Sequence, residues 1–381
     1  MCAQITLQSI ADRLGCSAKT VSNAFNRPDQ LSSATRERVL AVAAELGYPG
    51  PNPLAAGLRR GRVGAIGFAY ANPLSYAFED PVSVALLAGI SAVAEGEGAG
   101  LLLVPGSADG ERSAAAITAA VIDGLLIFSM ADDDPLVNAA IARRLPTVVV
   151  DEPEPAALAG RGGPAPCWVG VDDAAGARLA AQHLLDLGHE RIAVITFSLY
   201  RGQERGRMGE SEQAAATYAV SRRRLEGYRR AITAAGLDWS AVPVMAGVTS
   251  SVEEGAAAAA AVLELGPPPT AVLCLSDRLA EGAVRELRRR GLDVPGDVSV
   301  VGFDDADTAA GLGLTTVRQP HRGKGERATE ALLALMAGQT VAPVQVLETK
   351  LVVRGSAGPA APARGSPGRP APDYDRGRWP N

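Results

Sequence analysis

The chain of 381 residues is long enough for two or three domains, and 47% of its residues are hydrophobic, so it can bury a large core. Its net charge of −5 is unevenly distributed: residues 1–62 carry +4, residues 63–355 carry −11 and residues 356–381 carry +2. The basic charge therefore lies in the first segment, where phosphate is a possible partner, and the acidic charge lies in the remainder.

Several functional classes are disfavoured by the composition. No signal-peptide pattern opens the chain and no uninterrupted apolar run reaches membrane-spanning length, so we expect a cytoplasmic protein with no membrane partner. The cysteines show neither a close pair nor metal-ligand spacing, which predicts buried free thiols and neither metal nor cofactor. They are Cys2, Cys16, Cys167 and Cys274.

Residues 5–26 predict two short helices joined by a tight turn at Gly15, each begun by an N-capping side chain. In the second helix Val21 and Phe25, four residues apart, must point inward. The outward side is then short, polar and basic, and suits a DNA major groove. It carries Ala18, Lys19, Ser22 and Asn23.

A third helix is predicted from Ser32 to Gly47, with apolar residues that can close a small core over the first two. A further short helix is expected over residues 52–60, where Pro53 suits a first helical turn.

After Arg62 the pattern changes to apolar runs of strand length that alternate with amphipathic helices. Such alternation is typical of doubly wound parallel sheets, and the length favours two lobes. Strands are predicted at 63–70, 100–106, 123–129, 147–153, 167–172, 191–198, 243–248, 271–277 and 298–305, with helices at 81–98, 176–189, 222–236 and 278–291. Residues 356–381, rich in Pro, Gly and Ala, predict a disordered and passive tail.

The motifs TVSNAFN, TRERVLAVAAELGY and NPLAAGLRRG occur in this order, in a nearly gapless match from Ile5 to Gly67. The chain thereby resembles the LacI/GalR family of bacterial transcription regulators, and the resemblance resumes at WVGVDDAAGARLAAQHLLDLGHERIAVI and VPGDVSVVGFDDADTAAGLGLTTVRQP. It implies an N-terminal all-α helix-turn-helix head and an α/β, two-lobed, periplasmic-binding-protein-like body. The expected divisions are a DNA-binding domain at 1–51, a hinge helix at 52–62, an effector-binding and dimerisation domain at 63–355 and the tail at 356–381.

The resemblance assigns DNA contacts residue by residue. Base contacts are expected from Ala18, Lys19 and Asn23, since lysine can donate to guanine and asparagine can pair bidentately with adenine. Leu58 is expected to wedge into the minor groove at the centre of a palindrome. Phosphate contacts are expected from Thr6, Ser17, Thr20, Ser22, Asn26, Ser32, Thr35 and Tyr48, several of which are also plain helix caps.

In the body, the resemblance places a small-molecule effector between the two lobes, with a sugar-like ligand as the family expectation. Arg224, Asp304 with Phe303 beside it, Ser276 and Asp151 are the matched positions, although a slip of one residue to Arg223 is open. The loop at 71–81 departs from the family pattern, and Tyr76, Phe78 and Asp80 are possible wall residues. The segment at 198–220 also departs from it and is a possible flap.

We therefore expect a sequence-specific transcription regulator that binds a near-palindromic DNA operator as a homodimer. A repressor is expected, because repression is the commoner behaviour in the family. Two alternatives remain open. An α/β enzyme lacks support from any nucleophile-elbow, Walker or zinc motif, and EGEGAG at 95–100 follows a helix instead of preceding one. A solute-binding protein would fit the lobes but not the head.

Overall fold

The computed structural model describes residues 5–48, 50, 63–104, 106 and 110–360. By internal contacts the chain divides into two units, Met1–Ala65 with Val121–Asp123, and Ile66–Ala120 with Gly124–Asn381. The predicted hinge with Leu58, and the tail beyond residue 360, lie outside the described residues.

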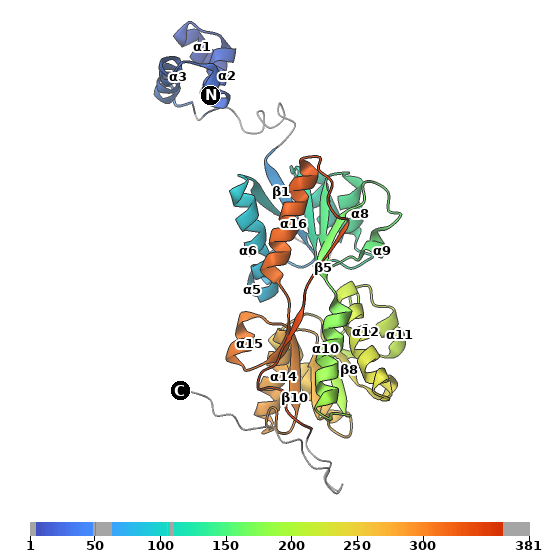
Figure 1. Cartoon of the computed structure of the whole chain (residues 1–381). Coiled ribbons are helices and arrows are strands. Elements are labelled where there is room, and N and C mark those ends of the chain that lie inside the picture. The colour runs from blue at the N-terminus through green and yellow to red at the C-terminus, as the bar shows by residue number, and fades with distance from the viewer. Residues whose placement is uncertain (1–4, 49, 51–62, 105, 107–109, 361–381) are drawn as a thin grey trace, which may run out of the picture. The chain divides into compact units, whose positions relative to one another are not determined.

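The first unit contains a three-helix head, with α1 (Leu7–Leu14), α2 (Ala18–Asn26) and α3 (Ser33–Glu45) and a 3-10 turn at Pro28–Gln30 (Figure 1). Each helix starts at a predicted hydroxyl cap, since the side chains of Thr6, Ser17 and Ser32 accept a backbone N–H of the first turn. Gly15 has φ +64°, the left-handed conformation that ends α1 at low cost. The core of the head consists of Ile10, Ala11, Val21, Ala24, Val39 and Ala43.

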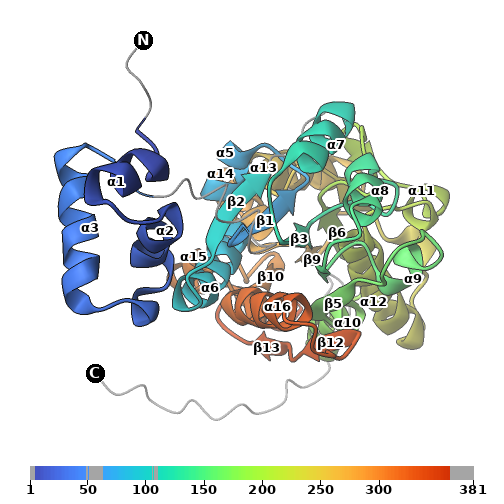
Figure 2. The same cartoon turned by 90° about the horizontal axis from the view of Figure 1, so that it is seen from above.

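The second unit is the body, and its N-terminal lobe is built on a six-stranded sheet in the order β12-β5-β4-β3-β1-β2. The β1–β3, β3–β4, β4–β5 and β5–β12 pairs are parallel, as expected for a doubly wound sheet. Its strands are β1 (Ala65–Tyr70), β2 (Gly100–Val104), β3 (Gly124–Phe128), β4 (Thr147–Val150), β5 (Cys167–Val171) and β12 (Val344–Leu347). Its helices are α5 (Leu74–Glu79), α6 (Pro81–Gly96), α7 (Gly110–Ala119), α8 (Pro135–Ala142), α9 (Pro155–Leu158) and α16 (His321–Met336). Helices α6 and α16 cover one face of the sheet and α7 and α8 the other (Figure 2).

The C-terminal lobe has a seven-stranded sheet in the order β13-β11-β10-β9-β6-β8-β7, antiparallel only at its two outer pairs. Its strands are β6 (Ile192–Thr196), β7 (Gly206–Arg207), β8 (Val244–Ala246), β9 (Ala271–Cys274), β10 (Ser299–Asp304), β11 (Thr315–Arg318) and β13 (Lys350–Val352). Its helices are α10 (Asp173–Asp186), α11 (Glu210–Ala214), α12 (Ala219–Ala234), α13 (Val252–Glu264), α14 (Asp277–Arg289) and α15 (Asp307–Gly311), with a 3-10 turn at Trp239–Ala241.

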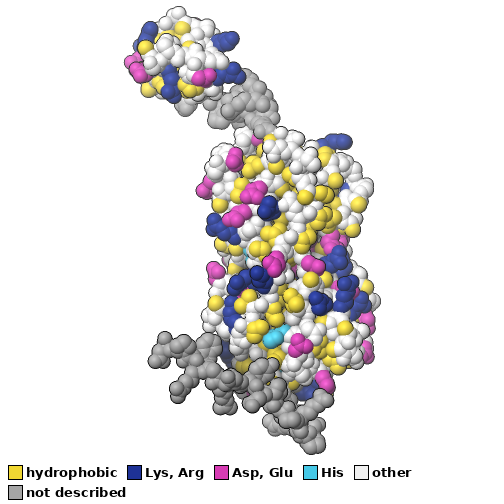
Figure 3. Space-filling model, viewed as in Figure 1, with side chains coloured by type: hydrophobic (Ala, Val, Ile, Leu, Met, Phe, Trp, Pro, Cys, Tyr) yellow, Lys and Arg dark blue, Asp and Glu magenta, His cyan; other side chains and the backbone are white. Residues whose placement is uncertain are grey.

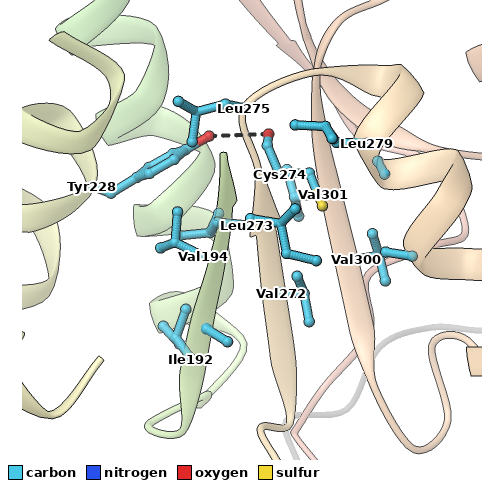
Figure 4. Packing of buried hydrophobic residues seen from close by; sticks show 14 of the residues in the cluster. Ile192, Val194, Tyr228, Val272, Leu273, Cys274, Leu275, Leu279, Val300 and Val301 are labelled. Atoms are coloured by element: carbon cyan, nitrogen blue, oxygen red, sulfur yellow. Dashed lines mark hydrogen bonds between the residues drawn. The ribbon is translucent and has the colours of Figure 1, made fainter. Parts of the chain in front are cut away.

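The core of this lobe is made by side chains of its central strands. Ile192 and Val194 of β6, Leu273 of β9 and Val301 of β10 interdigitate, and the Tyr228 hydroxyl of α12 donates to the carbonyl oxygen of Cys274 at 3.3 Å (Figure 4). Cys167 and Cys274 are buried free thiols, as predicted, whereas Cys16 is a free thiol that is only partly buried.

The chain passes between the lobes three times: from β5 to α10, from β11 to α16, and from β12 to β13 (Figure 1). These crossings complete each sheet with strands from distant parts of the sequence. None of the described helices has the length and apolarity needed to span a bilayer.

Residues 356–360, assigned above to the tail, are in fact packed on the C-terminal lobe. The Ser356 hydroxyl donates to the Val300 carbonyl oxygen at 2.6 Å, and the Gly358 carbonyl oxygen lies 2.9 Å from Nε2 of His189. His189 also contacts Thr270, which directly precedes β9, and Ser299 at the start of β10, and so joins the end of the described chain to this edge of the sheet. The Pro-, Gly- and Ala-rich composition of this stretch predicted disorder, but composition does not reveal the backbone hydrogen bonds that hold it on the lobe.

Candidate functional site

A cleft lies between the two lobes of the body, where the carboxyl ends of the strands face one another, the usual place for a ligand on open α/β sheets. It encloses about 860 Å³, including its opening to solvent. Its wall includes six of the predicted effector residues: Tyr76, Asp80, Asp151, Arg224, Ser276 and Asp304.

Arg224, on the buried face of α12, is the centre of an ionic cluster at the C-terminal side of the cleft. Its Nε donates to Asp173 Oδ1 at 2.8 Å, and its Nη1 lies 3.6 Å from Asp304 Oδ1. Its guanidinium carbon lies 3.8 Å from the centre of the Phe303 ring. Burial raises the pKa of both carboxyl groups, and the Arg224 charge opposes that rise. The Arg224 guanidinium therefore lies at the cleft with its carboxyl partners, Asp173 and Asp304, already beside it.

Lys324, in the first turn of α16, forms a second cluster on the N-terminal side. The residue is 1% exposed, and its ammonium donates to Asp151 Oδ2 at 2.5 Å and to Gln319 Oε1 at 3.0 Å. Gln319 in turn donates to Asp304 Oδ1 at 2.8 Å. A chain of hydrogen bonds thus connects Asp151 of one lobe to Asp304 of the other.

Burial shifts the pKa of two further ionisable groups in the cleft wall toward the neutral form. Burial, followed by the charges of Lys324 and Arg224, holds the pKa of His321 well below its usual range, and both ring nitrogens are buried without a hydrogen-bond partner. Burial raises the pKa of Glu152 to about 8, although its carboxylate accepts the Val220 N–H at 2.9 Å. These groups favour partners that offer hydroxyls over partners that carry charge.

Contacts across the cleft hold the lobes together on both sides. The Tyr76 hydroxyl of α5 donates to the Ser250 carbonyl oxygen at 2.9 Å. On the other side Arg222 of α12 bonds Asp132 at 3.0 Å and Glu154 at 2.8 Å. A change in the separation of the lobes must break or make these contacts.

Two of the predicted cleft residues do not line it. Phe78 is 61% exposed on α5, because it lies two residues from Tyr76 and a helix turns its side chain about 200° away. Phe303 is fully buried beneath Arg224, so it supports the cleft without forming its wall. Of the two candidate arginines, Arg224 is the one that lines the cleft. The Arg223 side chain is half exposed and pairs with Glu154.

The possible flap at 198–220 is a folded segment that contains β7 and α11. Its two ends reach the cleft, through Ser198 at one end and through Tyr218 and Val220 at the other.

The sequence analysis missed the contribution of Gln319, His321 and Lys324, which all lie in RQPHRGKG at the second crossing. The local sequence shows polar residues between strand β11 and helix α16, neither of which was predicted. The direction in which they point depends on the crossing of the chain and not on local pattern.

In the head, the predicted base-reading side of α2 is open to a partner. Lys19 is exposed, while Ala18, Ser22 and Asn23 are partly exposed, and Asn23 Nδ2 bonds Gln30 at 3.3 Å. The predicted phosphate contacts bond one another: Ser17 with Thr20 at 2.9 Å, Ser32 with Thr35 at 2.8 Å, and Asn26 with Ser22. Thr6 caps α1, and the Tyr48 ring packs edge-on against Phe25. Hydroxyls that already cap helices still have lone pairs and protons to share with phosphate.

A helix-turn-helix head and a two-lobed α/β body with a cleft define the class of ligand-responsive DNA-binding regulators. The chain belongs to the lacI family of bacterial regulatory proteins, whose model matches residues 6–52, and a periplasmic binding protein-like domain matches residues 181–357.

Individual proteins agree with this assignment. The HTH-type transcriptional regulator Rv3575c of Mycobacterium tuberculosis is 42% identical over 361 residues, which cover 93% of this chain and 98% of that one. The solved structure of the regulator CelR in complex with cellobiose is 30% identical, has a TM-score of 0.66, and is matched over 93% of this chain and 100% of that one. The Lac repressor dimer bound to operator and an anti-inducer is 27% identical with a TM-score of 0.72, over 93% and 99% of the two chains.

Proposed function

We propose that this regulator binds a near-palindromic operator as a homodimer, represses transcription, and changes its operator affinity when a small sugar-like effector occupies the cleft. The observation that carries the proposal is the pairing, in one chain, of an exposed basic face on α2 with a cleft lined by the Arg224 and Lys324 clusters. The solved relatives support both halves, since one holds cellobiose and another, a dimer, holds operator DNA.

The division of labour along the chain is part of the proposal. Residues 1–51 read DNA, residues 52–62 with Leu58 act as the hinge, residues 63–355 bind the effector and dimerise, and residues 361–381 serve as a passive tail. No catalytic step is assigned to the cleft, and the proposed place of action is the cytoplasm, where the chromosome lies. Within the described ranges no cluster of His, Cys, Asp or Glu could hold a metal ion.

A selection from random double-stranded DNA tests the regulator function directly. We expect one enriched, near-palindromic sequence, bound with an affinity that falls steeply with salt because Lys and Arg displace counter-ions. No enrichment over random competitor would refute the DNA-reading role.

Lys19→Ala then tests base reading. Loss of a lysine contact to a base should cost about 1–3 kcal/mol at one position of the site and relax preference there. Arg13→Ala is the matched control, because it removes the same charge from the exposed surface of α1. It should weaken binding to all sequences about equally, and an equal relaxation of preference by both variants would contradict the assignment.

A further inference from the structure

We propose that the ion pair between Asp151 and Lys324 is a specificity device: it excludes anionic ligands and restricts the effector to uncharged, hydroxyl-rich molecules. The inference rests on the effector-binding role proposed above and narrows the chemical class of the effector.

The first step is the balance of charge around the cleft. Its wall has four carboxyl groups, Asp80, Asp151, Glu152 and Asp304, and two cations, Arg224 and Lys324. Behind the wall, Asp173 adds a fifth carboxyl next to Arg224, and Arg278 adds a third cation, whose guanidinium carbon lies 5.5 Å from the centre of the Tyr76 ring. Five carboxyl groups therefore stand against three cations, and even with two of the five protonated these groups offer no net positive charge to an anion.

The second step is that the two cations of the wall, Arg224 and Lys324, are each already paired inside the protein. Arg224 is held by Asp173 and Asp304 together with the Leu275 carbonyl oxygen, and Lys324 is held by Asp151. Burying a charge without a partner is costly, which is why a lysine at 1% exposure needs this carboxylate. A ligand phosphate or carboxylate would have to displace an internal carboxylate, and then leave that group buried and unpaired.

The third step concerns the uncharged groups that the rest of the cleft wall presents to a ligand. Small polar side chains and neutral groups line the cleft beside aromatic rings, an arrangement that suits hydroxyls on one edge of a ligand and C–H groups on its faces. The polar groups are Asn72, Ser129, Ser198, Thr249, Ser250 and Ser276, and the rings are Tyr70, Tyr76, Phe128, Phe197 and Tyr218. On the face of the body drawn in Figure 3, acidic and basic side chains lie interspersed.

The test compares neutral ligands with their acidic counterparts in thermal-shift measurements on the full chain at pH 6.5. Glucose, galactose and cellobiose are the neutral probes, and glucuronate, galacturonate and glucose 6-phosphate are the anionic ones. At a hundredfold excess over Kd, a ligand that binds only the folded protein should raise Tm by roughly 4 °C. We expect such shifts from the neutral set alone.

Asp151→Asn then releases the Lys324 ammonium, and should raise the affinity for a uronate relative to its neutral sugar by at least about tenfold. Asp172→Asn is the matched control, because Asp172 is exposed, outside the cleft, and caps α10 at 2.9 Å from the Ala175 nitrogen, a role that asparagine also fills. The control should leave the ranking of ligands unchanged.

Three results would overturn the proposal: a larger shift from an anionic probe than from its neutral partner in the unmodified protein, an Asp151→Asn variant that folds with an unchanged ranking, or no shift from any neutral probe. The ranking in the unmodified protein decides the matter if the variant does not fold. Each of these failures leaves the DNA selection intact, so it is distinguishable from a failure of the regulator function.

Discussion

Helix α16 carries two cleft residues, His321 and Lys324, and its position depends on a contact with α6 that has no room for a side chain. A Cβ atom built on Gly89 of α6 would lie 2.1 Å from the Arg322 carbonyl oxygen and 3.0 Å from the Glu326 nitrogen of α16. Ordinary contacts begin near 3.4 Å. Gly89→Ala must therefore push the two helices apart by more than 1 Å.

The expected cost follows from two opposing effects. Overpacking costs about 1–3 kcal/mol, and contact with backbone atoms, which cannot rotate away, places this variant near the upper value. The gain in helix propensity from alanine returns about 1 kcal/mol. The net loss of about 2 kcal/mol corresponds to a fall in Tm of roughly 3 °C for a body of about 300 residues. Weaker ligand binding should accompany it, because α16 moves with Lys324.

Differential scanning calorimetry of Gly89→Ala and Gly96→Ala provides the measurement. Gly96 lies in the same helix, is exposed, and has no atom within 4 Å of a built Cβ, so its replacement should leave Tm unchanged or raise it slightly. Equal Tm values for the two variants would refute the argument from close helix contact.

Two further predictions concern buried charge. Arg224→Met leaves Asp173 and Asp304 without their guanidinium and should lower the free energy of unfolding by about 3–5 kcal/mol in urea titrations; the neighbouring half-exposed Arg223→Met should cost at most about 1 kcal/mol, and similar costs for both would contradict the buried cluster. For Glu152, the folded state keeps a proton that the unfolded chain loses, so between pH 4.5 and about 8 stability should fall as pH rises. Glu152→Gln should flatten that slope between pH 5 and 9, and an unchanged slope would show that another group causes it.

The fold was largely predictable because its strands are strong local signals. All nine predicted apolar runs contain strands of the structure, and EGEGAG ends a helix, with Gly98 at φ +66°. The short strands β7, β11, β12 and β13 were missed, as was α16. The places of β12 and β13 in the sheets depend on chain crossings between segments far apart in sequence, which no local pattern reveals, and β7 has only two residues.

The cleft was only partly predictable for the same reason. Arg224, Asp304 and Ser276 were found by their match to a family motif. Nothing in the local sequence distinguishes Lys324 from the other polar and charged residues at the start of its helix. Its burial becomes evident only with Asp151, which lies 173 residues earlier in the chain. Phe78 is the opposite error. It was predicted to line the cleft because it is an aromatic residue in a cleft loop, but helix α5 turns its side chain outward.

The interleaved path of the chain has a consequence for synthesis on the ribosome. The N-terminal lobe begins with β1, yet its sheet is closed by β12 and covered by α16, which emerge more than 200 residues later. A nascent lobe would expose the faces of β3 and β4 that α16 later shields. Truncation before α16 should therefore yield an aggregating fragment and not a half-sized ligand binder, and any attempt to express the lobes separately must join segments that translation delivers far apart in time.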